Sequence, residues 1–329
     1  MKAAFPVTRS ILSTTALSEV VGKEYAIGTP SDCQFLQFGL NDTYVLKTTA
    51  ETHVLRIYRK GWRSLSDIQY ELDVLLFLRR AGINVSVPIQ RTDGNFVGTV
   101  HAPEGERYTV LFSYAPGREV TYKAKDAEAA AAYGTLAAQI HTATERFTTP
   151  HQRTALDLEH LIDSPLRSIQ SMLAHRQENW EYLQALTDKL RLWVTELAPS
   201  GLGRGFCHGD LHWGNVHQDD HMLTLFDFDC CGIGWRAYDL AVFRWAARLR
   251  KKEAEQWPAF LGGYQEERQL QEADIQSIPY FVALRHVWLM GLHVGSRQDF
   301  GTAWLNDAYF DEAFNFLREW EAEHLGELT

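Results

Sequence analysis

The residues best suited to chemistry lie close together in the second half of the chain, between His208 and Asp229. Asp210 and Asn215 are five positions apart in a glycine-containing segment, and Asp227 follows twelve positions after Asn215, at the end of an apolar run. Phosphoryl transfer needs such residues, because an attacking hydroxyl must be oriented and magnesium must be held against the phosphates. We expect Asp210 to orient the hydroxyl and accept its proton. Asn215 and Asp227 offer the oxygen ligands that magnesium prefers, and Asp229 is a further candidate for the same metal region.

Two other interpretations of this segment remain open. His208 and His212 have the i, i+4 spacing of two zinc ligands on a helix, and the carboxylates could instead cap turns. Gly209 and Gly214 disfavour a helix here, and no H-E-x-x-H motif is present. The spacing H-x-D-L-x-x-x-N followed by an aspartate therefore favours phosphoryl transfer over both alternatives.

The first third of the chain has the pattern of a β-sheet with one helix. The turn at 39–42 lies between two strands and predicts a hairpin. Residues 64–81 predict a helix, because Ser64 is a capping residue, Asp67 follows three positions later, and Gly82 follows the end. The expected strands are Gln34–Phe38, Thr43–Thr48, His53–Tyr58, Phe96–Val100 and Tyr108–Ser113.

The pattern changes at Tyr114–Gly117, after which the chain is mostly helical apart from a short β-like region at 205–230. The sequence thus predicts an α+β fold with two lobes, a small β-rich N-lobe at 1–113 and a larger helical C-lobe at 114–329, joined by a hinge near 112–117. Ligand sites favour the cleft between such lobes. The expected helices are 126–145, 178–197, 236–250, 272–295 and 307–325.

Composition limits the partners of the chain. The formal net charge of -10 argues against a nucleic-acid partner, and no apolar stretch is long enough to predict a membrane helix. The N-terminal residues lack the pattern of a signal peptide. The four cysteines include no C-x-x-C pair, so we expect reduced thiols in a cytoplasmic protein. The oligomeric state does not follow from the sequence.

The segment His208–Asn215 resembles the signature of the aminoglycoside phosphotransferase and choline kinase family, which includes the second type of homoserine kinase and a stress-response kinase that acts on proteins. The resemblance implies a protein-kinase-like fold, with ATP and Mg²⁺ as cofactors. By position, Asp210 matches the catalytic aspartate, and Asn215 and Asp227 match the magnesium ligands. Asp239 matches an aspartate that we expect to brace the catalytic loop.

The same resemblance assigns nucleotide contacts in the first third of the chain. Val54 would line the adenine site and Arg56 would reach the phosphates, with Glu71 as the acid that pairs with Arg56. The hinge residues Ser113, Tyr114 and Ala115 would bond the adenine edge through their backbone. His141 matches another recurring family position, for which we expect a structural role.

The sequence departs from the kinase pattern at several of these positions. The phosphate loop has one glycine, Gly39, so Asn41 and Thr43 are expected to help cover the phosphates. Arg56 replaces the usual lysine and would bind phosphate with more donors in a planar fork. Only eleven residues separate Asp227 from Asp239, which leaves no room for a long activation segment.

The acceptor is expected to be a small hydroxylated molecule, with an amine or amino alcohol as one option. The C-terminal part holds five tryptophans and three acids that could bind a cation, although core tryptophans and a solvated helix face are the favoured interpretation. A protein Ser/Thr kinase and a non-catalytic nucleotide-binding pseudokinase are the alternatives, and the sequence does not distinguish ATP from GTP. The residues of the cation-binding interpretation are Trp213, Trp235, Trp245, Trp288, Trp304, Asp307, Asp311 and Glu312.

Overall fold

The computed structural model describes residues 5–120, 126–197, 201–220 and 222–326. The chain separates into two compact units, each assembled from segments that are distant in the sequence. The lobe boundary expected near 112–117 stays a prediction. The first unit contains the described parts of Met1–Arg118, Phe147–Arg153 and His217–Asp229, and the second those of Glu119–Arg146, Thr154–Val216 and Cys230–Thr329.

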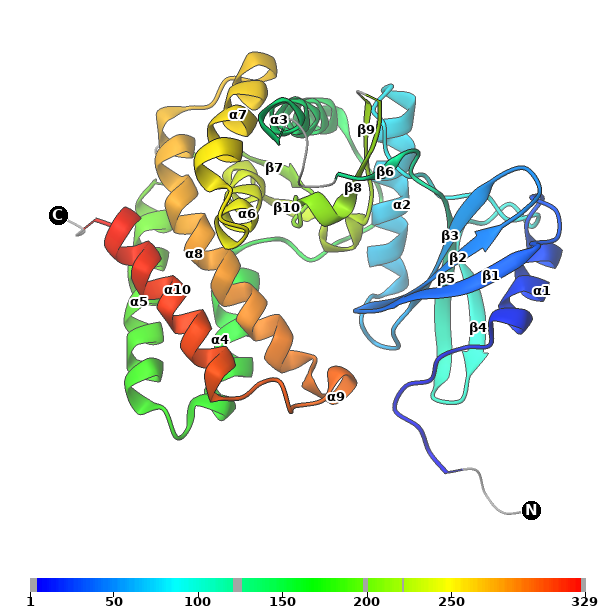
Figure 1. The fold of residues 1–329 in the computed structure, drawn as a ribbon, viewed down its shortest axis with the longest axis horizontal. Helices are drawn as coiled ribbons and strands as arrows, with labels where there is room; N and C mark the ends of the chain where they lie inside the picture. The colour runs from blue at the N-terminus through cyan, green and yellow to red at the C-terminus, as the bar shows by residue number, and fades with distance from the viewer. Residues whose placement is uncertain (1–4, 121–125, 198–200, 221, 327–329) are drawn as a thin grey trace. The chain divides into compact units, whose positions relative to one another are not determined.

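A five-stranded antiparallel sheet with the strand order β1-β2-β3-β5-β4 forms the centre of the first unit (Figure 1). This confirms the predicted hairpin and the third strand, while the fourth strand is shifted by two residues and the fifth begins three residues earlier than predicted and ends where predicted. The strands are β1 Asp32–Phe38, β2 Asn41–Lys47, β3 Thr52–Tyr58, β4 Gly98–Ala102 and β5 Gly105–Ser113.

The two helices of this unit contact opposite faces of the sheet (Figure 1). Helix α1 Thr14–Glu24 was not predicted, and it buries Leu17 and Val21 against alternate β3 residues such as Leu55. Side chains alternate between the faces of a strand, so Arg56 points to the other face. There it meets Glu71 of α2 Leu65–Arg80.

The predicted capping of α2 is confirmed. The Ser64 side chain accepts a hydrogen bond from the Asp67 amide, and the Asp67 carboxylate accepts one from the Ser64 amide. Such a capping box satisfies two amides that a helix start otherwise leaves unpaired. It fixes the start of the helix whose second turn carries Glu71.

A short hairpin completes the first unit and ends just before Asp227. Strands β8 Val216–Asp219 and β9 Met222–Leu225 form it, and β6 Arg118–Glu119 lies beside β8 in the order β6-β8-β9. The β-like region expected at 205–230 thus contains a strand before Asp227, but this strand ends at Leu225 and does not include Asp227.

Helices dominate the second unit, as the sequence predicts, and the α+β fold class is confirmed. Helix α8 runs through its middle beside α4, α5, α6 and α10 (Figure 1). No helix among the described residues has the length and apolarity needed to span a membrane. The helices are α3 Asp126–Ala143, α4 Ser164–Ile169, α5 Gln177–Leu197, α6 Arg236–Leu249, α7 Glu253–Glu267, α8 Glu272–Gly295, α9 Arg297–Phe300 and α10 Asp307–His324.

Shorter elements complete the second unit. Strands β7 Arg204–Cys207 and β10 Gly232–Trp235 pair antiparallel, and β10 was not predicted. One turn of π-helix, η2 Glu159–Asp163, precedes α4. The 3-10 turns of the chain are η1 Thr144–Arg146, η3 Gln170–Leu173, η5 Trp213–Asn215 and η6 Phe228–Cys230, the last of which begins in the first unit.

Helices α3 and α7 approach each other closely because each carries a glycine at their contact. A Cβ atom on Gly134 would lie 1.9 Å from the Phe260 carbonyl oxygen, and one on Gly263 would lie 2.0 Å from the Ala131 carbonyl oxygen. Neither position therefore accepts a side chain at this separation. The pair of helices lies beside the segment that contains Asp210, since the Tyr133 hydroxyl donates to the His212 carbonyl at 3.2 Å.

Candidate active site

The segment after β7 is held in place by a buried aspartate of α6. Asp239 accepts hydrogen bonds from the backbone amides of His208 and Gly209, each at 2.7 Å. This geometry confirms the predicted bracing role of Asp239. Gly209 has a φ of +81°, and a Cβ there would lie 2.3 Å from the Cys230 carbonyl oxygen, so glycine is required. Asp210 therefore follows a rigid, tightly packed turn.

His141 supports Asp239 from the other side. Its Nε2 lies 2.9 Å from Asp239 Oδ2 and its Nδ1 lies 2.8 Å from the Tyr264 hydroxyl. Burial lowers the pKa of His141 more than the neighbouring Asp239 raises it. The predicted structural role of His141 is thus confirmed, because it supports the aspartate that braces the loop containing Asp210.

The Asp210 carboxylate is surrounded by three polar side chains of the second unit. Arg285 Nη2 lies 2.5 Å from Oδ1, while His212 Nε2 and Asn215 Nδ2 lie 3.2 Å and 3.1 Å from Oδ2. Burial alone would raise the pKa of Asp210, but the charges of Arg285 and His212, with His208 behind them, outweigh it and hold this pKa well below its usual range. Asp210 is therefore a fixed carboxylate that keeps its charge.

Asn215 closes the loop onto Asp210 at the end of η5. Its amide nitrogen donates to the Asp210 carbonyl at 2.9 Å as well as to the carboxylate. Because the nitrogen faces Asp210, the amide oxygen is the atom that a cation would meet. The loop thus brings together the predicted catalytic residue and one predicted metal ligand.

Arg56 is the centre of a buried polar cluster in the first unit. Its Nη1 lies 2.6 Å from Glu71 Oε1 and 3.3 Å from the Tyr58 hydroxyl, and its Nη2 lies 2.9 Å from Asp227 Oδ1. The pKa of Arg56 lies well above its ordinary value, because Glu71 and its other anionic neighbours outweigh the desolvation that burial causes. The pairing of Arg56 with Glu71 is confirmed, and Tyr58 was not predicted.

Asp227 combines an uncommon backbone conformation with a half-exposed side chain. Its φ is +61°, an uncommon value for a residue other than glycine, and its side chain is 49% exposed. Such a conformation persists where the surroundings enforce it, often at functional sites. Its one described partner is the guanidinium of Arg56, so a carboxylate oxygen remains available to a metal ion.

Asp229 has different surroundings, although it is only two residues away. Trp62 Nε1 donates to its Oδ2 at 2.8 Å and Arg63 Nε to its Oδ1 at 3.0 Å, and Arg153 donates to its carbonyl. Burial would raise the pKa of Asp229, but the guanidinium groups of Arg63, Arg56 and Arg153 lower it well below its usual range. Its assignment to the metal region stays a prediction, while the hydrogen bonds give it a bracing role.

The predicted phosphate-covering residues share a face of the sheet with Arg56. Thr43 lies directly opposite Arg56 in the β2–β3 register, and Asn41 and Val54 follow it on the same face by alternation. Gly39 lies in the turn between β1 and β2, and its amide donates to the Asn41 carbonyl at 3.1 Å. The sheet thus brings these residues together, and their contacts with a nucleotide stay a prediction.

The predicted hinge residues follow the end of β5. Ser113 and Tyr114 use their amides within the unit, donating to the carbonyls of Val87 at 2.9 Å and Thr52 at 3.3 Å. Within the described ranges, nothing accepts a hydrogen bond from the Ala115 amide. Of the three amides it is the one that stays available to a ligand, and adenine binding at the hinge stays a prediction.

The zinc interpretation of the histidines lacks support in the described part of the chain. No cluster of three candidate ligands there includes His208 or His212. A cluster of His141, Cys207 and Asp239 does exist. The oxygens and nitrogens of its aspartate and histidine already pair with amides, with each other and with a tyrosine. This cluster is therefore a structural brace.

Six of the eight residues of the cation-binding interpretation are buried or paired within the second unit. Trp213, Trp235, Trp245 and Trp288 are buried in the core, as the favoured interpretation predicts. The cation beside two of them is the chain's own Arg285, whose Cζ lies 5.0 Å and 4.6 Å from the rings of Trp245 and Trp288. The acids Asp307 and Asp311 form ion pairs with Arg176.

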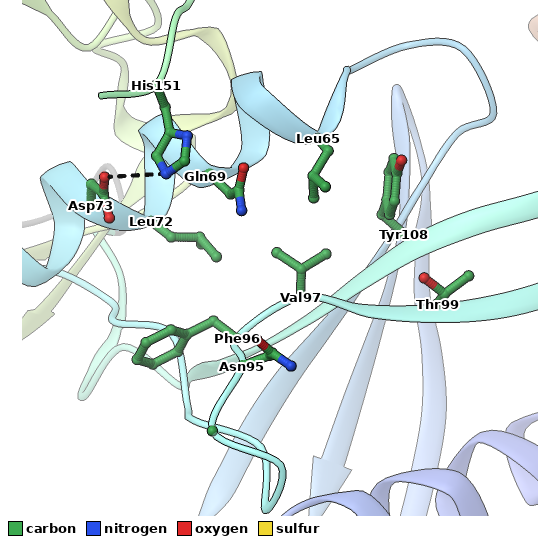
Figure 2. A pocket seen from close by; sticks show the side chains of 11 residues that line it. Leu65, Gln69, Leu72, Asp73, Asn95, Phe96, Val97, Thr99, Tyr108 and His151 are labelled. Carbon is green, nitrogen blue, oxygen red and sulfur yellow. Dashed lines mark ion pairs between the residues drawn. The ribbon is translucent and has the colours of Figure 1, made fainter. Parts of the chain in front are cut away.

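Figure 2 shows a separate pocket of about 380 Å³ in the first unit. It lies along one face of α2, and Asp73 and His151 form a long ion pair of 3.9 Å at one end. None of the predicted site residues lines it, so it is distinct from the candidate active site. Its lining is Leu65, Gln69, Leu72, Asp73, Gly94, Asn95, Phe96, Val97, Thr99, Tyr108 and His151.

Comparison with known proteins gives consistent results. A model of the phosphotransferase enzyme family matches residues 34–273. An uncharacterized protein of Deinococcus radiodurans is 41% identical over 98% of this chain and 94% of its own. Homoserine kinase of Rhizobium meliloti is 25% identical over 81% of this chain and 82% of its own. The solved structure of amicoumacin kinase hAmiN, in complex with AMP-PNP, Ca²⁺ and Ami, has a TM-score of 0.76 at 23% identity and covers 95% of this chain and 94% of that chain. The likeness confirms the predicted kinase-like fold.

Proposed function

Because the chain belongs to the phosphotransferase enzyme family, we propose that it transfers the γ-phosphate of ATP, with Mg²⁺, to a hydroxyl group of a small metabolite. The observation that carries this proposal is the Asp210 carboxylate, held in a braced loop with the Asn215 amide against it. A rigid carboxylate beside a metal-binding amide is what the attack of a hydroxyl on a phosphate requires.

Each residue of the two clusters has a role in this proposal. Asp210 orients the acceptor hydroxyl and takes its proton, and groups of this kind contribute about 100- to 10,000-fold to rates. Asn215 and Asp227 would hold magnesium, which neutralises developing charge on the phosphates. Arg56 binds the phosphates, and Glu71 keeps it extended and charged. Asp229 braces the backbone next to Asp227 through Trp62, Arg63 and Arg153.

The fit of magnesium rests on the chemistry of the donors. The side-chain nitrogen of Asn215 already donates a hydrogen bond to Asp210, which leaves the amide oxygen for a metal ion. Asp227 offers a half-exposed carboxylate on a backbone with positive φ. Both are hard oxygen ligands of the kind that magnesium prefers, and the neighbouring His212 imidazole faces the Asp210 carboxylate and the Asn215 nitrogen. Calcium would bind the same oxygen donors with a less strict coordination geometry.

We infer that the acceptor is a metabolite that carries a hydroxyl group, such as an amino alcohol or a hydroxylated amino acid. Homoserine kinase is among the relatives, and homoserine carries a hydroxyl and an amine. The short stretch between Asp227 and Asp239 supports a small acceptor over a protein, because it has no room for a long activation segment.

A screen with purified protein tests this proposal. ATP and Mg²⁺ are mixed with a panel that includes homoserine, aminopropanol, choline and aminoglycosides, and ADP release is measured above the rate without acceptor. We expect at least one acceptor to stimulate ADP release, with EDTA abolishing the stimulation and added Mg²⁺ restoring it. No stimulation, together with metal-independent ATP binding in calorimetry, would support a pseudokinase, and stimulation by a protein alone would support a protein kinase.

A further inference from the structure

Asp210 has a neighbour that no part of the loop motif contains. Arg285 lies 75 residues later in the chain, in the middle of α8, and its Nη2 lies 2.5 Å from Asp210 Oδ1. Its Nη1 also lies 3.4 Å from the Gly209 carbonyl oxygen. The guanidinium therefore contacts both the carboxylate and the backbone just before it.

The surroundings of Arg285 make it a fixed group. Its side chain is only 4% exposed, whereas that of Asp210 is 20% exposed. The rings of Trp245 and Trp288 lie 5.0 Å and 4.6 Å from its Cζ, which is the distance of a cation–π contact. A planar guanidinium stacked in this way loses little freedom when it binds a carboxylate. Arg285 is thus a buried support that leaves the exposed edge of Asp210 for an acceptor.

The two oxygens of Asp210 consequently have different surroundings. Arg285 contacts Oδ1, while Oδ2 faces His212 and Asn215. A carboxylate held at one oxygen by a guanidinium keeps one orientation and becomes a weaker base. Phosphoryl transfer tolerates a weak base, because its transition state is loose and depends mainly on positioning.

We propose that Arg285 is a positioning residue, whose guanidinium between Trp245 and Trp288 holds Asp210 in the orientation that phosphoryl transfer needs. This inference rests on the proposed function, because Asp210 must act on the acceptor hydroxyl. It assigns to α8 a role in the reaction beyond that of a core helix. The alternative is that Arg285 only holds the loop backbone through Gly209.

A double-mutant cycle of wild type, Arg285→Gln, Asp210→Asn and the double variant tests the inference. A misplaced reacting group costs roughly 100-fold, so we expect Arg285→Gln to lower kcat about 10- to 100-fold while KM for ATP changes less than about threefold. Arg285→Lys, which keeps the charge, should recover part of the loss. In the Asp210→Asn background, Arg285→Gln should have no further effect on kcat. Arg167→Gln, which breaks an exposed ion pair with Glu159 in the same unit, is the control.

Additive losses of kcat in the double variant would overturn the inference, as would unchanged or faster turnover in Arg285→Gln. Urea unfolding of the same proteins provides a second measurement that needs no turnover. Non-additive losses of unfolding stability are expected if the side chains of Arg285 and Asp210 are coupled, and additive losses would overturn the inference even if no acceptor is found. A failure of the proposed function would instead appear as absent turnover in the wild type.

Discussion

At the scale of single residues, the contact between Asp210 and Asn215 follows from their local spacing, because five positions of a braced loop keep them within hydrogen-bond distance. The roles assigned to these two residues and to Asp227 stay predictions. Arg285 could not be found in this way. It reaches Asp210 from a helix 75 residues later, and an arginine in an apolar helix gives no indication of its partner. The same holds for Trp62, Arg63 and Arg153 around Asp229.

Arg56 provides a prediction at this scale. Arg56→Lys should keep a cation beside Glu71 and weaken ATP binding about tenfold or less, equivalent to about 1.4 kcal/mol. Arg56→Met should weaken ATP binding more. It should also lower the free energy of unfolding by about 3–5 kcal/mol, because the buried Glu71 carboxylate loses its partner. Calorimetry with ATP and Mg²⁺ measures the affinity, and urea unfolding measures the stability.

The control for this comparison is Arg79→Met, which removes an exposed cation from the end of α2. It should change neither quantity appreciably. Equal ATP affinity in wild type and Arg56→Met, with folded protein in both cases, would show that Arg56 does not contact the phosphates.

At the scale of elements, periodicity and capping residues closely predicted the first three strands and the six helices α2, α3, α5, α6, α8 and α10. Helix α7 was missed because Pro258, Gly262 and Gly263 give it a poor helical pattern. The reason for Gly263 is visible only in the packed structure, where α7 touches the backbone of α3. Strand β10 was missed because the two glycines of Gly-Ile-Gly-Trp disfavour a strand, and its pairing with β7 compensates for them.

The α3–α7 contact gives a prediction with a built-in control. Gly263→Ala would place a Cβ 2.0 Å from the Ala131 carbonyl oxygen, so the helices must separate. We expect a loss of about 1–3 kcal/mol or more in the free energy of unfolding. Gly262→Ala, one residue earlier, meets no atom within 4 Å and should raise stability by up to about 1 kcal/mol through helix propensity. Urea unfolding of both variants makes the comparison, and equal stabilities would contradict the close packing.

At the scale of the whole molecule, the change from strands to helices after Tyr114 predicted the α+β class, because composition differs along the chain. The assembly of the units from distant segments was not predicted. The first unit includes 147–153 and 217–229, which lie far beyond the strands that form its sheet. Arg153 ties its segment to α2 through the Asp67 carbonyl at 2.7 Å. Contacts between segments that are distant in the sequence leave no local pattern from which they could be predicted.

The net charge of the whole chain gives little information about the acceptor. The net charge of -10 does not by itself identify a cationic acceptor, and two of the acids considered for cation binding, Asp307 and Asp311, are paired with Arg176. Acceptor selection must therefore be determined by screening. Family membership and the loop geometry instead support the reaction type.

The central claim is that the chain transfers phosphate from ATP and that Asp210 serves this step. Turnover of wild type and Asp210→Asn, with Mg²⁺ and the best acceptor of the screen, tests it most directly when ATP affinity is measured on the same samples. Asp210 acts mainly in the transition state, so its removal should slow turnover and leave ground-state ATP binding nearly unchanged. We predict a loss of about 100- to 10,000-fold in turnover, equivalent to about 3–5 kcal/mol of barrier. Full turnover in a folded Asp210→Asn protein would contradict the account.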